Sequence, residues 1–67
     1  MIYKYKLLEP MLGWNKGELF ELDTEWGEWT RKRTGETFST RGSIKDGETA
    51  LLLNYLSIQN SFMENVS

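Results

Sequence analysis

The sequence contains neither cysteine nor histidine, and proline occurs once in 67 residues. Without cysteine the chain can form no disulfide framework and no thiolate nucleophile, which fits a reducing, intracellular setting. Without histidine it also lacks the usual general base at neutral pH and a common zinc ligand. Most enzyme classes are therefore disfavoured, and we expect a non-catalytic protein without a cofactor or a metal site.

Long apolar runs are missing as well. No segment approaches the ~20 apolar residues of a transmembrane helix, and the start of the chain alternates charge with apolar bulk, unlike a signal peptide. The formal net charge is −2, whereas a general polyanion binder needs an excess of Lys and Arg. The glycines are dispersed among turns and match no phosphate-binding pattern. We expect a cytoplasmic protein with no membrane partner and no small-molecule substrate.

The length of the chain limits what it can bury. A chain of 67 residues has room for a single domain, and a domain of this size removes only about 60% of its unfolded surface from water. Three Trp, three Tyr and three Phe residues offer large rings that fill a thin core efficiently. The composition predicts one folded domain, residues 1–67, that gains stability from aromatic packing, from a partner, or from both.

Alternating polar and apolar residues predict four short strands in about residues 1–45. Pro10 ends the first strand, and Thr34-Gly35 joins the last two as a hairpin, because glycine accepts a positive φ. On the first strand Tyr3, Tyr5 and Leu7 share the predicted core face. The predicted strands are residues 2–8, 18–22, 28–33 and 36–40.

The period changes from two to about 3.6 after Asp46, which is a plausible N-cap, and predicts an amphipathic helix over about residues 47–64. Leu53 lies outside the predicted apolar arc, so the helix has more apolar surface than one sheet contact needs. The arc consists of Leu51, Leu52, Tyr55, Leu56, Ile58, Phe62 and Met63.

Four or five short strands followed by one C-terminal helix predict an α+β fold with a small, strongly curved antiparallel sheet, either an SH3-like barrel or a roll. Residues 16–23, Lys-Gly-Glu-Leu-Phe-Glu-Leu-Asp, follow Leu7 and Pro10. This stretch resembles the first loop and second strand of small SH3-like barrel proteins, including short ones encoded by phages and prophages. The resemblance covers about the first third of the chain. It implies an architecture and assigns no functional residues.

Acidic residues cluster between positions 18 and 28 without the spacing of a calcium loop. A domain this small rarely encloses a cleft that desolvates a carboxylate, so we interpret the cluster as a solvated strand edge and loop.

The function predicted first is protein binding, to a larger protein or to a second copy of the chain. Trp14 and Trp26 lie in predicted loops, and tryptophan is enriched among interface hot spots. The wide apolar face of the predicted helix would suit a docking surface or a homodimer. The candidate protein-binding residues are Trp14, Trp26, Leu53, Leu56 and Met63.

The alternative function is binding of single-stranded nucleic acid by the hairpin of a small β-barrel. Rings beside cations suit base stacking together with phosphate contacts. In a hairpin, however, Trp29 would also serve as a core residue, and edge-strand charges prevent edge-to-edge pairing. The candidate residues for this function are Trp29, Arg31, Lys32, Arg33 and Arg41.

Overall fold

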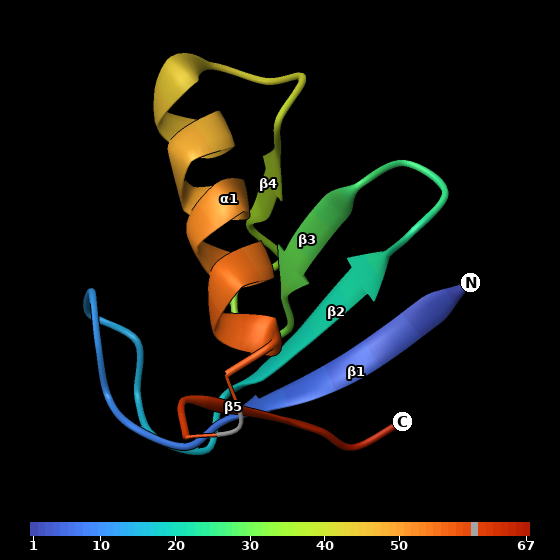
Figure 1. Ribbon diagram of the computed structural model, residues 1–67. Coiled ribbons are helices and arrows are strands. Elements are labelled where there is room, and N and C mark those ends of the chain that lie inside the picture. Colours follow the sequence, from blue (N-terminus) through green and yellow to red (C-terminus); the bar gives the residue numbers. More distant parts are fainter. Residues whose placement is uncertain (60) are drawn as a thin grey trace.

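The chain forms four strands, one helix and a final strand in the computed structural model, which describes residues 1–59 and 61–67. The strands assemble into one antiparallel sheet in the order β4-β3-β2-β1-β5, and helix α1 lies against one face of it (Figure 1). The predicted α+β class is confirmed, and β5 is an element that the sequence pattern does not predict. The elements are β1 (Ile2–Leu7), β2 (Leu19–Asp23), β3 (Glu28–Arg31), β4 (Thr37–Ser39), α1 (Ile44–Ser57) and β5 (Met63–Asn65).

Strands β1 and β2 follow the period of two that their sequences show. In β1 the side chains of Tyr3, Tyr5 and Leu7 are less exposed than their neighbours, and Leu7 is fully buried. Phe20 of β2 lies opposite Tyr5 and is also fully buried. Because alternate residues of a strand face the same side, these apolar residues form one inward face. The predicted core face of β1 is confirmed.

Strands β3 and β4 form the predicted hairpin. The Arg31 N–H donates to the Glu36 carbonyl oxygen at 2.8 Å, and the Gly35 N–H donates to the Arg31 carbonyl oxygen at 2.8 Å. Gly35 has a φ of +77°, a conformation that strains residues with a Cβ. Glycine at this position therefore lets the chain reverse, and the reversal sets Trp29 opposite Phe38 across the two strands.

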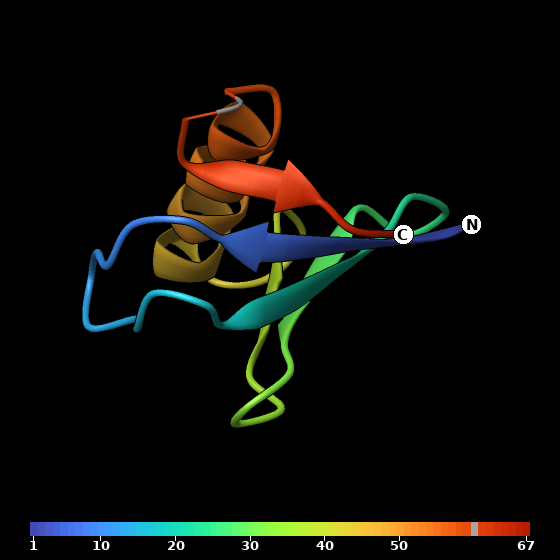
Figure 2. The ribbon, with the colours of Figure 1, turned by 90° about the horizontal axis from the view of Figure 1, so that it is seen from below.

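The sheet stays open within the described part of the chain. Its edges are β4 and β5, and β1 lies between β2 and β5. The start of β1, the end of β2 and the turn after β2 extend beyond the helix (Figure 2). The strong curvature and the barrel closure that we expected from the sequence are therefore not confirmed.

Helix α1 begins earlier than predicted, because Ser43 and not Asp46 is its N-cap. The Asp46 N–H donates to Ser43 Oγ at 3.2 Å, and Ser43 has the extended backbone typical of an N-cap. Asp46 lies in the first turn, where its negative charge stabilises the positive end of the helix dipole.

The helix also ends at Ser57 instead of near residue 64. In the last turn the Ile58 N–H donates to the Tyr55 carbonyl oxygen at 3.3 Å, a short-range bond that tightens the helix end. Met63 then pairs with Leu7, which gives β1 a second strand neighbour. Without β5, β1 would expose a row of unpaired N–H and C=O groups, so strand pairing prevails there over a longer helix. Residue 60, which the predicted helix includes, lies outside the described residues.

Two opposite faces of α1 are apolar, and the one that packs on the sheet is not the predicted one. Ala50, Leu53 and Leu56 are the buried residues of the helix, and Leu53 is fully buried. At about 100° per residue, Leu53 lies roughly 160° from Leu51 around the helix axis. The prediction that Leu53 lies outside the core face is wrong, because packing selects the narrow face formed by these three residues.

Three aromatic rings, those of Trp14, Phe20 and Trp29, are buried in the core. The rings of Trp14 and Phe20 meet edge to face with their centroids 4.9 Å apart. Trp29 is fully buried, and its indole Nε1–H donates to Asn54 Oδ1 on α1 at 2.8 Å. This bond ties the middle of the sheet to the helix. The buried apolar residues are Leu7, Trp14, Phe20, Trp29, Ala50, Leu53, Leu56 and Met63.

Candidate protein-binding surface

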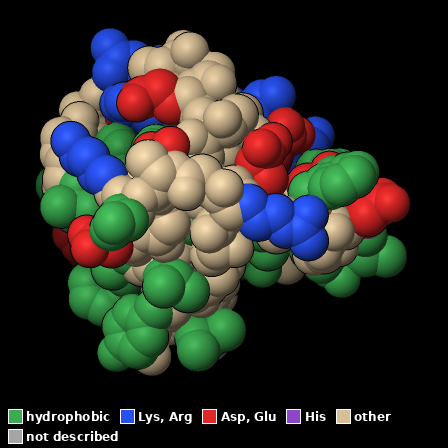
Figure 3. All heavy atoms as spheres, turned by 90° about the horizontal axis from the view of Figure 1, so that it is seen from above, with side chains coloured by type: hydrophobic (Ala, Val, Ile, Leu, Met, Phe, Trp, Pro, Cys, Tyr) green, Lys and Arg blue, Asp and Glu red, His purple; other side chains and the backbone are tan. Residues whose placement is uncertain are grey.

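The face of α1 that points away from the sheet carries a row of large apolar side chains, here called the outer stripe: Ile44, Leu51, Tyr55 and Ile58. Their exposed fractions are 83%, 60%, 57% and 75%. With about 100° per residue, the four side chains fall within an arc of about 60°. Hydrophobic side chains gather along the lower margin of the view in Figure 3, on the side where α1 lies. The stripe therefore runs the full length of the helix.

The size of the outer stripe sets it apart from scattered surface leucines. A large side chain with its backbone exposes about 200 Å² when fully exposed, so the four exposed fractions amount to roughly 550 Å². The largest apolar patch on a typical monomer is about 300–600 Å² and often has a function. Glu48 is the acidic residue beside this arc, about 20° outside it. The stripe is thus at the upper end of what a soluble monomer exposes.

Four of the five predicted protein-binding residues lie inside the molecule. Trp14, Leu53, Leu56 and Met63 are all buried in the core, so they offer no surface to a partner. Their apolar character reflects packing between the helix, the sheet and the loop after β1. The fifth, Trp26, is 58% exposed, as expected for a tryptophan at the tip of a turn. The sequence interpretation did not name the outer stripe as a site, because it placed Leu51, Tyr55 and Ile58 in an apolar arc that is mostly core and began the helix after Ile44.

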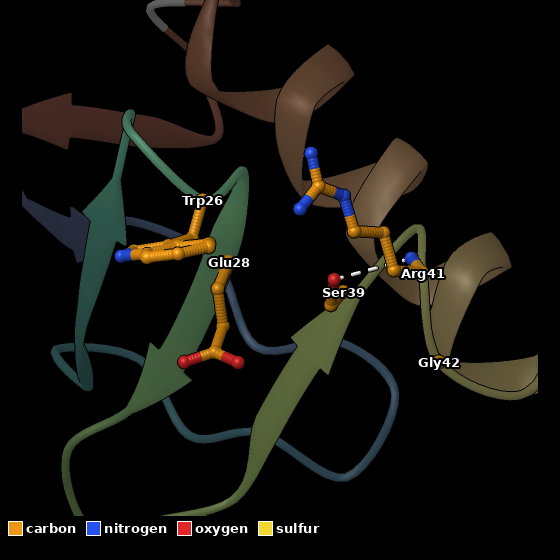
Figure 4. Close-up of a pocket in the computed structure, with 5 residues that line it drawn as sticks. All are labelled: Trp26, Glu28, Ser39, Arg41 and Gly42. Atoms are coloured by element: carbon orange, nitrogen blue, oxygen red, sulfur yellow. Dashed lines mark hydrogen bonds between the residues drawn. The ribbon is translucent and has the colours of Figure 1, made fainter.

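Trp26 borders a shallow hollow at one end of the sheet. Its lining residues are Trp26, Glu28, Ser39, Arg41 and Gly42. Figure 4 shows the Arg41 guanidinium pointing toward α1 and away from the Glu28 carboxylate. The Arg41 N–H donates to Ser39 Oγ at 3.1 Å, which fixes the backbone after β4. The hollow holds one ring, one cation and one acid, and its groups do not converge on a common point.

The residues predicted for nucleic-acid binding do not share one surface. Trp29 is fully buried, so its ring cannot stack on a base. Arg31 is held by two carboxylates, and the Lys32 ammonium lies 3.0 Å from Glu21 Oε1. Arg33 and Arg41 are exposed, but they belong to the hairpin turn and to the segment after β4.

A nearly buried ion pair explains why Arg31 is not available to a ligand. Arg31 Nε and Nη2 donate to the two oxygens of Glu18 at 2.6 and 2.8 Å, and Nη1 donates to Glu36 Oε1 at 3.1 Å. The hydrogen bonds from Arg31, and a further one from the Asn15 N–H, lower the pKa of Glu18 from 4.5 to about 2, against the opposing effect of burial. The hydrogen bonds of Arg31 to Glu18 and Glu36 raise the pKa of Arg31.

Glu18 also corrects the interpretation of the acidic cluster as solvated. Its side chain is buried, whereas Glu25 in the turn after β2 is exposed. The bidentate bond to Arg31 and the bond from Asn15 compensate for the loss of water around the carboxylate. The pair joins the residue before β2 to the end of β3 and is a structural element of the sheet.

The described residues contain no group of three or more acidic side chains placed to hold a metal ion. Within the same part of the chain, no helix has the length and apolar character needed to cross a membrane. Comparison with protein-family models, with curated proteins and with solved structures finds no match to the chain. The resemblance of residues 16–23 to SH3-like barrel proteins stays a prediction.

Proposed function

We propose that the chain is a non-catalytic module that binds protein through the outer stripe of α1. The observation that carries the proposal is the exposure of Ile44, Leu51, Tyr55 and Ile58 along one face of a helix whose opposite face is already packed. A helix needs only one apolar face to attach to its own sheet. The second apolar face is mostly exposed and contributes little to the fold of the monomer.

The energetics favour a covered stripe. Burial of apolar surface contributes about 25 cal/mol per Å², so roughly 550 Å² represents about 14 kcal/mol of gross transfer free energy on one side of a contact. The losses of rotational, translational and side-chain freedom on binding offset much of this. An amphipathic helix face is a common way to bind an apolar groove or another helix.

Nucleic-acid binding is less well supported by the geometry. It requires exposed rings beside free cations, and the predicted ring of Trp29 and the predicted cation of Arg31 are both engaged inside the protein. The formal net charge of −2 adds no general attraction for phosphate.

A photo-crosslinking residue in place of Leu51 tests the proposal in cells that produce the protein. We expect covalent protein adducts from position 51 on the outer stripe, and far fewer from position 19. Leu19 is the matched control, because it is an exposed leucine on β2. The adducts should disappear when Ile58→Lys is added, since a charge in the stripe must lose its water in any apolar contact.

Two results would contradict the proposal. One is an equal, low yield of adducts from positions 51 and 19. The other is an undiminished yield from position 51 in the Ile58→Lys variant, provided that circular dichroism shows the variant to be folded. Either result would mean that the outer stripe is not a protein contact.

A further inference from the structure

Three of the four side chains in the outer stripe are placed symmetrically about Leu51, whereas the position that mirrors Tyr55 is Gly47. Ile44 and Ile58 lie seven residues before and after it, and all three are exposed. Seven residues make about two helical turns, so each isoleucine lies about 10.5 Å from Leu51 along the same face. A two-fold axis through Leu51 would therefore place Ile44 of one copy on Ile58 of another, and would bring the two Leu51 side chains together.

We propose that the outer stripe binds a second copy of this chain, with the two α1 helices antiparallel about a two-fold axis at Leu51. This inference rests on the proposed function and names its partner. A contact between identical copies must be self-complementary, so that each patch matches itself after rotation. The spacing of Ile44, Leu51 and Ile58 meets this condition, which an arbitrary row of apolar residues would not.

Glu48, the acidic residue beside the outer stripe, fits the same arrangement. Glu48 lies three residues before Leu51 and Tyr55 four residues after it, so the antiparallel pair sets each Glu48 beside Tyr55 of the partner subunit. The tyrosine hydroxyl can donate a hydrogen bond to the carboxylate, which would satisfy both groups. In a parallel pair, each Glu48 would meet the other Glu48, and the two negative charges would repel. The position of Glu48 thus selects the antiparallel arrangement.

The distribution of charge along α1 points the same way. Its charged residues are Lys45, Asp46 and Glu48, all in the first half of the helix, and residues 49–57 are uncharged. In the antiparallel pair the charged half of each helix faces the neutral half of the other, so no charges of the same sign meet. The positive end of each helix dipole also lies beside the negative end of its neighbour.

The area available predicts a dimer of modest affinity. Two stripes of roughly 550 Å² give a total of about 1,100 Å². Specific interfaces need about 1,000 Å², and stable ones of standard size bury about 1,600 Å². We therefore expect a dissociation constant of roughly 10–100 µM, so that the chain is monomeric when dilute and dimeric when concentrated.

Sedimentation velocity over a range of concentrations measures this equilibrium. The unmodified protein should change from monomer to dimer, and Leu51→Glu should raise the dissociation constant by at least about 30-fold, because it sets two carboxylates against each other at the axis. Leu19→Glu, on the sheet, is the control and should leave the equilibrium unchanged. If the unmodified protein remains monomeric up to about 1 mM, far above the expected dissociation constant, the inference is overturned.

Cysteine crosslinking tests the antiparallel register, and the absence of native cysteine gives it a clean background. Leu51→Cys should form a disulfide-linked dimer with itself under mild oxidation. Ile44→Cys should not, because its two copies would lie about 21 Å apart, but it should link to Ile58→Cys when the two variants are mixed. Self-linkage of Ile44→Cys without linkage to Ile58→Cys would show a parallel pair and contradict the proposal.

The two proposals fail in different ways. If the protein is monomeric at all concentrations but the crosslinker at position 51 still captures a different protein, the second copy is excluded and protein binding through the stripe stands. If position 51 gives no adduct at all, both proposals fail.

Discussion

Leu51 and Leu53 are two positions apart on α1 and face opposite directions, so replacing each with alanine separates the two apolar faces of the helix. Leu53 is fully buried among the core residues, and Leu51 is 60% exposed. A buried Leu→Ala change removes about 2–5 kcal/mol, from the lost transfer free energy and the cavity left behind. At Leu51 less than half of the side chain is shielded from water, which limits the loss to about 1 kcal/mol.

The size of the domain makes this difference easy to measure. At about 0.05–0.15 kcal/mol per residue, a chain of 67 residues has a free energy of unfolding of roughly 3–10 kcal/mol. Leu53→Ala should therefore remove a large share of the stability. With a denaturant slope of about 1 kcal/mol per M in urea, its unfolding midpoint should fall by about 2 M or more, and that of Leu51→Ala by less than about 1 M.

Urea unfolding followed by tryptophan fluorescence measures both midpoints, because the buried indole of Trp29 becomes exposed to water on unfolding. The protein should be kept near 1 µM, so that self-association does not add to the stability of the folded form. If Leu53→Ala does not fold, Leu53→Met conserves the volume and should cost less than about 1.5 kcal/mol. Equal losses for Leu51→Ala and Leu53→Ala, or a larger loss for Leu51→Ala, would refute the assignment of the two faces.

Three further substitutions test local features. The Glu18 carboxylate is stabilised by Arg31, and its pKa falls from 4.5 to about 2, so its contribution to stability is complete above pH 4.5 and is lost as the pH drops toward 2. Glu18→Gln should abolish this part of the acid dependence in thermal melts. An unchanged dependence of the melting temperature on pH would contradict this role of Glu18. Ser43→Ala removes the N-cap and should cost about 0.5–2 kcal/mol in urea unfolding, whereas Ser43→Asp should retain most of the stability. Leu12 is exposed and has a φ of +52°, a conformation that asparagine adopts with less strain than leucine. Leu12→Asn should therefore raise the free energy of unfolding by up to about 1 kcal/mol. A lower free energy of unfolding would show that the contacts of the Leu12 side chain stabilise the fold by more than its backbone strain destabilises it.

The strands of residues 1–45 could be predicted because each carries its own local signal. Tyr3, Tyr5 and Leu7 alternate with polar residues, and Gly35 marks the turn between β3 and β4. These signals act over a few neighbouring residues, so they remain valid whatever the rest of the chain does. The element β5 has no such signal. Met63–Asn65 is too short to show a period, and its conformation depends on pairing with β1, about 60 residues earlier in the chain.

The face of α1 was mispredicted because both of its faces are apolar. Hydrophobic periodicity selects the wider arc, which contains Leu51, Tyr55 and Ile58. The sheet instead takes the face of Ala50, Leu53 and Leu56, where a small residue lets the helix approach closely. Of these three residues, Leu56 belongs to the predicted arc. Only the position of the helix on the sheet decides between the two, and that position depends on contacts between segments far apart in sequence.

The ion pair of Glu18 and Arg31 lies beyond sequence reasoning for a similar reason. The two residues are 13 positions apart, and the approach of their side chains depends on the pairing of β2 with β3. One signal was available: Glu18 begins one predicted strand, and Arg31 lies in the later half of the next, so an antiparallel pairing brings the acid near the cation. That signal could have warned that Arg31 is engaged and not free for phosphate.

The two neighbours of β1 in the sheet differ greatly in their distance along the sequence, because β2 follows it closely whereas β5 lies about 60 residues further on. The meander of β1 to β4 and the helix can form from nearby segments as the polypeptide emerges from the ribosome. Leu7, however, can pair with Met63 only after β5 has been synthesised. Until β5 docks, one side of β1 offers free amide and carbonyl groups to any other nascent chain. Folding during synthesis therefore has a vulnerable interval that lasts until β5 has docked on β1, and slow docking of β5 would lead to co-translational aggregation.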